Sequence, residues 1–320
     1  MGHTSRLARY SGIDLESDRS DPILVCIGQL VVDVVVKDVS NRWPDGSWTQ
    51  EDCSISIQIG GAPLHACAGF GDAGYGSVVV SLLGGAEAIQ GGVRPDDLGQ
   101  YVLACLEQRG QAYDLEIRAG VPTGRIVLLY PRHVGRVMLT DAPGLARMSP
   151  EHVAGAIERA AAARRPLVVS LSGYVQFEDT FAEISAAVRS AAKRTGALLW
   201  IDVVPHDIYQ DISFADFLES VREADILSID EETCEGFAGS SGTSLSRVIS
   251  RLCELESTLF VSRPDGLVLA CGEQRSTMIP EDHQSGSGLP GHGDRLVAAA
   301  VARHVRARFR DAADRSTQVR

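Results

Sequence analysis

The second half of the chain alternates between helical and strand-like apolar patterns, and this alternation restricts the fold more than any other feature. The predicted helices span 150–164, 180–194, 214–223 and 244–255, and the predicted strands span 167–171, 198–204, 225–229 and 259–262. Strict alternation of this kind favours right-handed βαβ units. It therefore predicts an α/β fold with a mostly parallel sheet that is covered by helices on both faces.

The first half of the chain adds two stretches of a different kind. Strands are predicted over 23–36, long enough to continue into a second element, and over 77–83, and a helix over 97–109. The segments of about 37–59 and 113–140 instead contain short alternating β patterns. They predict a small sheet that projects from the main domain, and long surface loops are the alternative. A β lid of this kind would exclude water from a reaction at the edge of the main sheet.

The predicted domain spans 21–310, between two polar ends. Residues 1–20 contain no apolar run typical of a signal peptide or an anchor. We expect 1–20 to be a flexible N-terminal segment and 311–320 a flexible C-terminal tail.

Charge and cysteine content argue against several classes of partner. The net charge of −12 disfavours nucleic acid. No apolar run approaches the ~20 residues that span a bilayer, so we expect no membrane partner. The seven cysteines are scattered without a CxxC pair, which disfavours a zinc site or a disulfide framework and favours a cytoplasmic location.

A glycine-rich loop, GSGLPGHGD at 286–294, leads into the last helical pattern. Glycines allow backbone N–H groups to approach an anion closely, and the start of a helix adds unpaired donors. Asp294 stands at this junction, where a carboxylate suits phosphoryl transfer to a hydroxyl group whose proton it accepts. The alternative is a helix-capping aspartate after a flexible loop.

Three more features are candidates for ligand contact. The paired Gly60 and Gly61 would let the backbone approach a ligand, with His65 one turn into the next helix, although a plain β-to-α turn explains the same pattern. Asp33 is a carboxylate in an apolar run, which favours a role in binding a polyol. Its alternative is a strand-end residue that faces solvent.

Dinucleotide and P-loop sites are not indicated. The GxGxxG pattern at 69–74 follows a helical pattern and precedes a strand, the reverse of a dinucleotide-binding turn. The sequence GxxxxGK[ST] is absent.

Five motifs together resemble those of the ribokinase-like (PfkB) family of carbohydrate and nucleoside kinases, of which this chain looks like a divergent member over about 22–310. In chain order, the motifs are Gly28-x-x-x-x-Asp33, Gly60-Gly61-Ala62-Pro63, Asp96-x-x-Gly99, ADILSIDEE at 224–232, and Gly291-x-Gly293-Asp294. The resemblance implies a three-layer α/β/α domain with a small β-sheet lid. It also implies ATP as donor, Mg²⁺, and a hydroxyl group of a sugar-like or nucleoside-like small molecule as acceptor.

The resemblance implies a role for each matching residue. Asp294 would be the catalytic base, and the loop around it, with His292 between its glycines, would form the anion hole. The anion-hole residues would be Gly291, His292 and Gly293, and the acceptor residues Asp33, Gly60, Gly61 and His65. The nucleotide residues would be Asp230, Arg263, Gly266 and Gly291, and the metal residues Asp230 and Glu232.

Several positions depart from the family pattern. Gly288 and Leu289 replace an Asp-Thr pair, which argues against activation by potassium. His292 and His65 replace an alanine and an asparagine, and the latter change points to an unusual acceptor. Thr233 stands where a glutamate normally orders Mg²⁺, and Glu231 and Glu232 are the candidates to compensate. A glycine is also missing from the turn that contains Arg263 and Gly266.

Two functions therefore remain open. The first is an ATP-dependent kinase that phosphorylates a sugar or sugar-like small molecule, with Asp294 as base. The second is a catalytically weak or inactive relative that binds a small molecule or a partner through the same cleft. In either case the exposed face of the lid is a candidate surface for a homodimer.

Overall fold

The computed structural model describes most of the chain, with gaps at both ends and in several connections. The described residues are 4–10, 21–39, 52–87, 92–131, 137–141, 147–172, 181–203, 207–263, 268–271, 277–279 and 292–318.

An 11-stranded sheet forms the centre of the molecule, in the order β1-β7-β5-β2-β10-β11-β12-β13-β14-β15, with β6 paired to β5. The strands from β7 to β13 run parallel, whereas β1, β6, β14 and β15 pair antiparallel. Their bounds are β1 Thr4–Arg9, β2 Ile23–Ile27, β5 Gly76–Glu87, β6 Val93–Pro95, β7 Ala112–Ala119, β10 Leu167–Ser172, β11 Leu198–Asp202, β12 Ile226–Asp230, β13 Thr258–Ser262, β14 Val268–Cys271 and β15 Thr277–Ile279.

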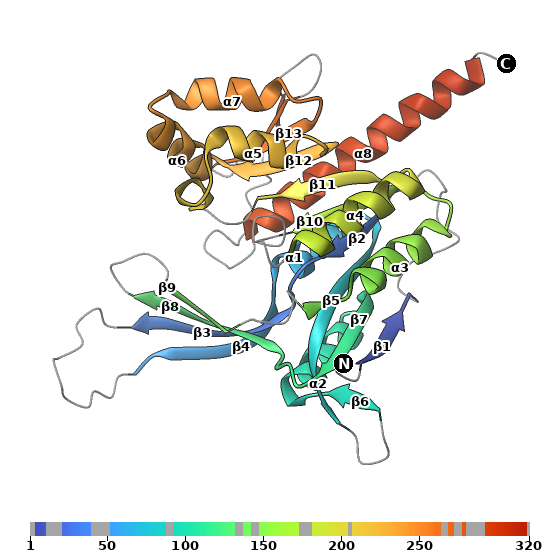
Figure 1. The fold of residues 1–320 in the computed structure, drawn as a ribbon, viewed down its shortest axis with the longest axis vertical. Helices are drawn as coiled ribbons and strands as arrows, with labels where there is room; N and C mark the ends of the chain where they lie inside the picture. The colour runs from blue at the N-terminus through green and yellow to red at the C-terminus, as the bar shows by residue number, and fades with distance from the viewer. Residues whose placement is uncertain are drawn as a thin grey trace.

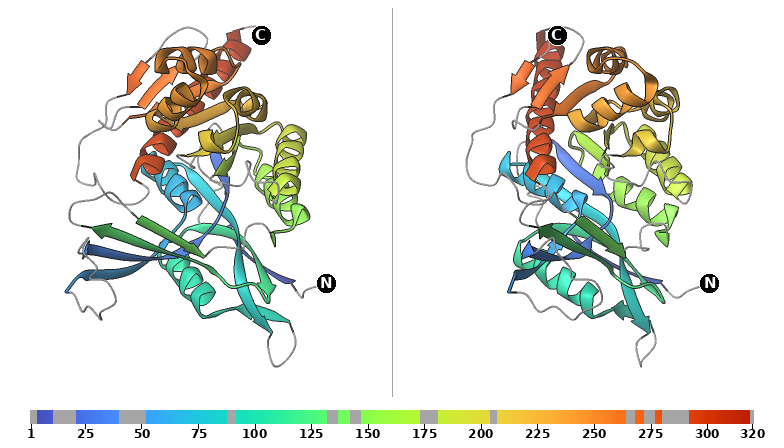
Figure 2. Two further views of the ribbon diagram at one scale, coloured as in Figure 1. Left: turned by 60° about the vertical axis from the view of Figure 1, so that its left-hand side comes forward. Right: turned by 90° about the vertical axis from the view of Figure 1, so that its left-hand side faces the viewer.

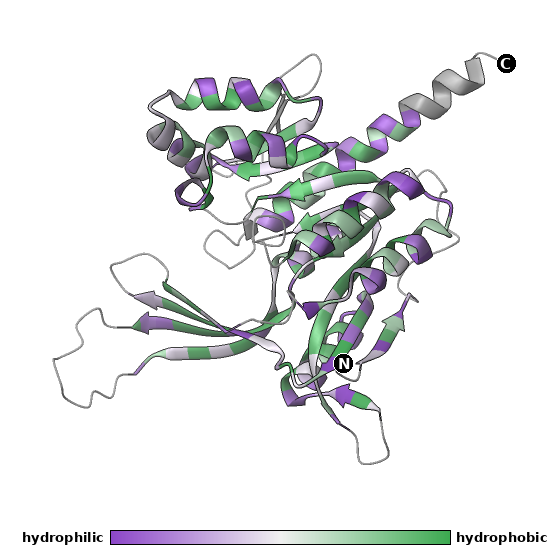
Figure 3. Cartoon of the chain, viewed as in Figure 1, coloured by the Kyte–Doolittle hydropathy of each residue, from purple (hydrophilic) through white to green (hydrophobic). Residues whose placement is uncertain are grey.

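Helices cover both faces of this sheet (Figures 1 and 2). One face packs against α3 Pro150–Ala161, α4 Ala182–Thr195, α5 Phe214–Val221, α6 Glu231–Ser241 and α7 Leu245–Cys253, with the short 3₁₀ helix η4 Ile208–Gln210. The other packs against α1 Ala62–Asp72, α2 Asp97–Gln108 and α8 His292–Gln318. The central strands are almost continuously apolar, while the helices alternate apolar and polar bands (Figure 3). The predicted three-layer α/β/α architecture with a mostly parallel sheet is confirmed. Among the described residues, no helix combines the length and the apolar character that a membrane span needs.

A separate four-stranded sheet, in the order β4-β3-β8-β9, projects to one side of the main domain (Figure 1). Its strands are β3 Val31–Val39, β4 Ser54–Gly60, β8 Gly124–Pro131 and β9 Val137–Asp141. The predicted lid is present. Its two segments were expected at about 37–59 and 113–140, and the first residue of each segment was predicted wrongly. Residues 31–36 belong to the lid because the apolar run leaves the main sheet after β2, and 112–119 belong to the main sheet because β7 pairs parallel with β5.

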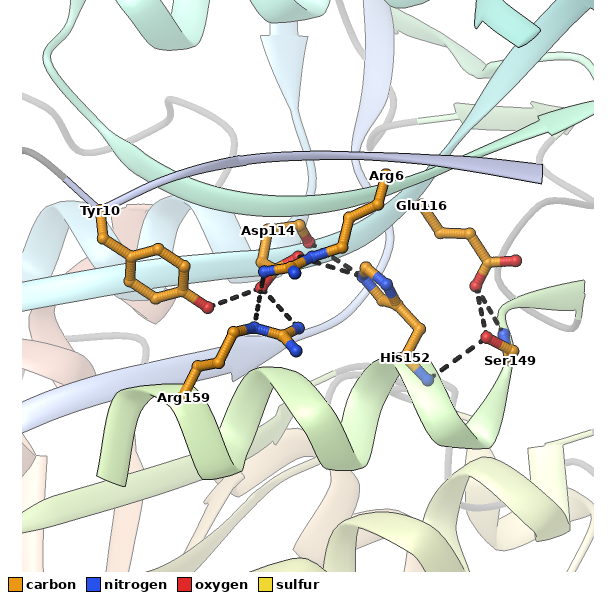
Figure 4. A network of polar contacts seen from close by, with 7 residues as sticks. All are labelled: Arg6, Tyr10, Asp114, Glu116, Ser149, His152 and Arg159. Carbon is orange, nitrogen blue, oxygen red and sulfur yellow. Dashed lines mark hydrogen bonds and ion pairs between the residues drawn. The ribbon is translucent and has the colours of Figure 1, made fainter. Parts of the chain in front are cut away.

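The N-terminal segment is more ordered than the sequence suggested. Strand β1 pairs antiparallel with β7 along its whole length, so 4–9 do not form a flexible end. Asp114 of β7 is fully buried and accepts hydrogen bonds from Arg6, Tyr10 and Arg159, at 2.6 to 3.0 Å (Figure 4). This buried carboxylate needs positive partners, and Arg6 ties β1 to the edge of the sheet by supplying one of them.

The C-terminal tail was also expected to be flexible, but α8 continues to Gln318. Residues 311–318 therefore extend the helix beyond the part that packs on the sheet. The segment contains no glycine or proline that would end a helix earlier.

Candidate functional site

Four neighbouring parallel strands end at one edge of the main sheet, and three of them end in a polar residue. Gly28 follows β2 directly, and Ser172, Asp202 and Asp230 are the last residues of β10, β11 and β12. β2 is also where the order of connections reverses, since β5 follows it on one side and β10 lies on the other. Ligands of open parallel sheets bind outside the carboxyl ends of the strands at such a switch point.

Helix α8 begins on the face of the sheet that these side chains share, and it packs closely on α1. A Cβ on Gly69 of α1 would stand 2.1 Å from the backbone oxygen of Arg295, so only glycine permits this crossing. The GxGxxG pattern at 69–74 therefore includes a helix-packing residue, which agrees with setting aside a dinucleotide site.

This crossing brings His65 of α1 near Asp294 of α8. Burial lowers the pKa of His65, and the negative charge of Asp294 partly offsets that effect. Asp294 is half-buried in the first turn of α8, next to Gly293. A Cβ on Gly293 would meet no atom of the described residues within 4 Å, so packing against them does not require a glycine there.

Asp202 is a functional candidate that the sequence analysis missed. Its side chain is buried, and burial together with the charge of Asp294 raises its pKa to about 7. Asp230 raises this pKa further, whereas the hydrogen bond from Ser228 and the nearby hydroxyl of Ser172 oppose the shift. The carboxyl groups of Asp294 on α8 and Asp230 on β12 thus both act on that of Asp202 at one edge of the sheet. The available signal was the acidic residue that ends the strand Leu-Leu-Trp-Ile-Asp, but a strand-end aspartate is common in a sequence and carries no motif.

The residues predicted to bind the acceptor lie together at the root of the lid. Asp33 of β3 is buried opposite Gln58 of β4, and burial raises the pKa of Asp33 to about 6, although a hydrogen bond from Gln58 opposes this. A Cβ on Gly60 would stand 2.0 Å from Oδ2 of Asp33. Gly61 has φ of 111°, and a Cβ there would lie 2.0 Å from the backbone oxygen of Gln29.

The backbone around Gly61 therefore requires a glycine, whereas a side chain at Gly60 would displace the carboxyl group of Asp33. Contact of these residues and of His65 with an acceptor stays a prediction.

The residues predicted to bind nucleotide and metal lie around the start of α6. Asp230 caps this helix, since its Oδ1 accepts the backbone N–H of Thr233 at 2.5 Å. Arg263, at the end of β13, pairs with Glu231 at 3.3 Å, and Glu232 is exposed. Thr233 is fully buried, so it cannot serve as a metal ligand in the place of a glutamate.

Other predicted positions are not placed. Gly266, Gly288, Leu289 and Gly291 lie outside the described residues, as does the side chain of His292, although its backbone begins α8. No group of three or more histidine, cysteine or acidic side chains within the described part of the chain could hold a metal ion by itself.

No protein-family model matches the chain, and no curated protein matches it in sequence. Solved structures of kinases do match it in fold. Adenosine kinase from Sinorhizobium meliloti is 13% identical, with a TM-score of 0.69 over 91% of this chain and 88% of its own. Fructokinase from Xylella fastidiosa with bound ATP is 14% identical, with a TM-score of 0.67 over 88% of this chain and 81% of its own. Burkholderia thailandensis nucleoside kinase in complex with inosine is 13% identical, with a TM-score of 0.60 over 88% and 83%.

The structural neighbours are thus sugar and nucleoside kinases of the ribokinase-like type. At this level of identity the likeness establishes the fold. The chain has the ribokinase-like fold that its sequence motifs predicted.

Proposed function

We propose that the protein is an ATP-dependent kinase that transfers the γ-phosphoryl group of MgATP to a hydroxyl group of a sugar-like or nucleoside-like small molecule. The observation that carries this proposal is the position of Asp294. It stands in the first turn of α8, beside the ends of the parallel strands, and interacts with both His65 and Asp202. A carboxylate next to the N–H groups of a helix start can accept a proton where negative charge on phosphoryl oxygens is stabilised.

In this mechanism the acceptor lies between the root of the lid, which carries Asp33, Gly60 and Gly61, and the first turns of α1, which carry His65. Asp294 accepts the proton of the acceptor hydroxyl while the oxygen of that hydroxyl attacks the γ-phosphorus. The bond from phosphorus to the bridging oxygen then breaks, and ADP leaves. The Gly291–Gly293 loop with His292 and the first turn of α8 would hold the phosphoryl oxygens.

Asp230 and Glu232 would hold Mg²⁺, which neutralises phosphate charge when it is bound. Hard carboxylate oxygens suit this ion, and a site with only one or two protein carboxylates is usual for Mg²⁺, which keeps several waters and binds phosphates as well. Arg263 and Gly266 would contact the nucleotide at the neighbouring strand end. The pairing of Arg263 with Glu231 keeps this arginine next to the metal residues.

A catalytically weak or inactive protein that binds a small molecule or a partner is the second candidate. The burial of Thr233 favours it, because the carboxylate that usually orders Mg²⁺ has no substitute at that position. Product formation from MgATP across a panel of sugars, nucleosides and cyclitols distinguishes the two. Turnover of any acceptor supports the kinase, whereas neither turnover nor ATP binding supports the second candidate.

Two further properties belong to the proposal. The described side chains of Cys26, Cys53, Cys67, Cys105 and Cys234 form no disulfide bond, which supports a reducing compartment, and we propose the cytoplasm. We also propose a homodimer through the lid. Its strands expose apolar side chains that water disfavours; the most exposed are Ile55, Ile57 and Leu139, at 63%, 60% and 55%.

A further inference from the structure

A chain of two buried hydrogen bonds leads from the core of the main sheet to Asp202. The indole Nε1 of Trp200 donates to Oγ of Ser228 at 2.7 Å, and this hydroxyl donates to Oδ1 of Asp202 at 2.5 Å. Trp200 and Asp202 project from the same face of β11, and Ser228 is the residue of β12 that pairs with Asp202. Trp200 and Ser228 are each 1% exposed.

The chemistry of these groups fixes the direction of both bonds. An indole N–H can only donate, so the hydroxyl of Ser228 must accept from Trp200. The single proton of this hydroxyl then has to go to an acceptor, because a buried donor without a partner is costly. Asp202 is its acceptor among the described residues, so Oδ1 of Asp202 accepts.

Consequently Oδ1 of Asp202 accepts the hydrogen bond from Ser228 whether or not Asp202 is protonated, and any proton that Asp202 carries sits on Oδ2. Trp200 cannot turn away to release the chain, since its ring stacks on Phe70 of α1 with 6.4 Å between centroids, inside the apolar layer under α1 and α8. The carboxyl group is therefore held in one orientation by groups that have no contact with solvent.

We propose that Trp200 and Ser228 are positioning residues of the phosphoryl-transfer site, which hold Asp202 so that Oδ1 stays bound and Oδ2 serves the ligand beside Asp294. This inference rests on the proposed kinase function for the identity of the ligand, but the relay itself does not depend on it. The raised pKa of Asp202 fits the arrangement, because burial and the charges of Asp294 and Asp230 raise it, and its charge is left for a ligand or a proton to balance.

The relay can be observed directly, because Trp200 is one of only three tryptophans in the sequence. Substitutions Trp43→Phe and Trp48→Phe leave Trp200 as the only emitter. In this background we expect the Trp200 emission to shift with a midpoint near pH 7 as Asp202 titrates. Asp202→Asn and Ser228→Ala should each abolish the shift, whereas Ser228→Thr, which keeps the hydroxyl, should retain it.

Asp294 of α8, Asp230 of β12 and the buried thiol of Cys26 on β2 also interact electrostatically with Asp202 or lie next to it. The Asp202→Asn variant separates their titration from that of Asp202. Ser170→Ala is the matched control, since Ser170 is a fully buried serine on the same face of the neighbouring β10 and is not part of the relay. It should leave the shift in place. An emission that ignores pH, or that keeps its shift in Ser228→Ala, overturns the relay.

Turnover supplies the second measurement. With the relay broken in Ser228→Ala or Trp200→Phe, we expect kcat to fall about 10-fold, the worth of one positioned hydrogen bond, with KM for the acceptor nearly unchanged. Ser170→Ala and Ser228→Thr should stay near the kcat of the parent protein. Full kcat in Ser228→Ala contradicts the positioning role even if the emission shift is present. If the parent protein binds no MgATP and turns nothing over, the proposed function fails, and the emission titration alone decides whether Trp200 and Ser228 hold Asp202.

Discussion

The backbone oxygen of Arg295 occupies the space in which a side chain at Gly69 would begin, 2.1 Å from the ideal Cβ position. Because of this contact, α8 crosses α1 with backbone nearly touching backbone, and Asp294 reaches the neighbourhood of His65. The distance between these two helices is therefore set by Gly69.

Gly69→Ala should separate α1 from α8 and destabilise the protein by about 1–3 kcal/mol, the usual cost of overpacking. Urea unfolding followed by circular dichroism measures this free energy. Gly71→Ala, in the same helix, is the control, because a Cβ there meets nothing within 4 Å. It should be neutral or stabilising by up to about 1 kcal/mol, since alanine favours a helix. Equal loss in both variants would show that the crossing does not depend on Gly69.

Asp294→Asn should lower kcat at least about 100-fold, because it removes the base but not the binding surface. Binding of MgATP, measured by calorimetry, should remain. Asp72→Asn serves as the control. Asp72 is an exposed carboxylate that pairs with Arg295, the residue that follows Asp294, so this variant removes a charge close to Asp294 without removing the base. Near-normal turnover in Asp294→Asn would reject the proposed mechanism.

Asp114→Asn should release β1 from the sheet. The carboxylate is buried and bound by Arg6 and Arg159, and its removal leaves two guanidinium groups without a counter-charge. Because both guanidinium groups that remain are partly exposed to water, we expect a cost of about 1–3 kcal/mol, the range for a hydrogen-bonding group left without its partner. Hydrogen exchange of the amides in 4–9 should accelerate strongly. In Asp141→Asn, where both partners of the ion pair with Arg125 are exposed, exchange and stability should hardly change.

His152 should make the protein less stable as the pH falls below about 6.5. Burial lowers the pKa of His152 below its ordinary value, and Asp114 only partly offsets this. The unfolded chain therefore binds a proton before the folded one does, so this contribution to stability is complete above pH 6.5 and is lost as pH falls towards the folded pKa. Asp114 faces His152 and stays ionised through this range, since hydrogen bonds from Arg6, Tyr10 and Arg159 outweigh its burial and lower its pKa.

The test compares free energies of unfolding at pH 7.5 and 5.5. His152→Gln should lose less stability between these values than the parent protein, which retains the buried histidine. His65 and His304 also have lowered pKa values and contribute equally to both proteins. An identical loss would show that His152 does not titrate with unfolding.

Ile57→Lys should shift the protein towards the monomer if the lid forms the proposed dimer. A charge on this exposed apolar face opposes burial in an interface. Sedimentation velocity measures the distribution of species. Glu219→Gln, on the exposed side of α5, makes the same one-unit change of charge away from the lid and should leave the distribution unchanged. A parent protein that sediments as a monomer at all concentrations would refute the dimer.

Local sequence patterns were sufficient for much of the fold. The helix predicted over 150–164 does begin at Pro150, and the Ser149 side chain caps it by accepting the backbone N–H of His152. The alternation after 150 correctly indicated the parallel sheet, because the period of apolar residues reflects which faces a strand or helix buries. The β patterns near 54–59 and 125–130 likewise indicated the lid.

The errors came from choices that no local pattern encodes. The strand over 112–119 alternates like a lid strand, but its pairing with β5 places it in the main sheet. Residues 4–9 look polar and unstructured until Asp114, more than a hundred positions later, provides a partner for Arg6. Asp202 carries no motif, and its importance follows from the strands and the helix that place Ser228 and Asp294 beside it.

The sequence by itself therefore determined the fold class, the lid and the motif residues Asp33, Asp230 and Asp294, because periodicity and short motifs depend on neighbours along the chain. Only the tertiary structure decided which of these side chains meet. The crossing of α1 and α8 at Gly69 and the register that sets Trp200 beside Ser228 depend on contacts between distant segments. Burial and charge at those contacts give Asp202 its raised pKa and join it to Asp294 in a single candidate site.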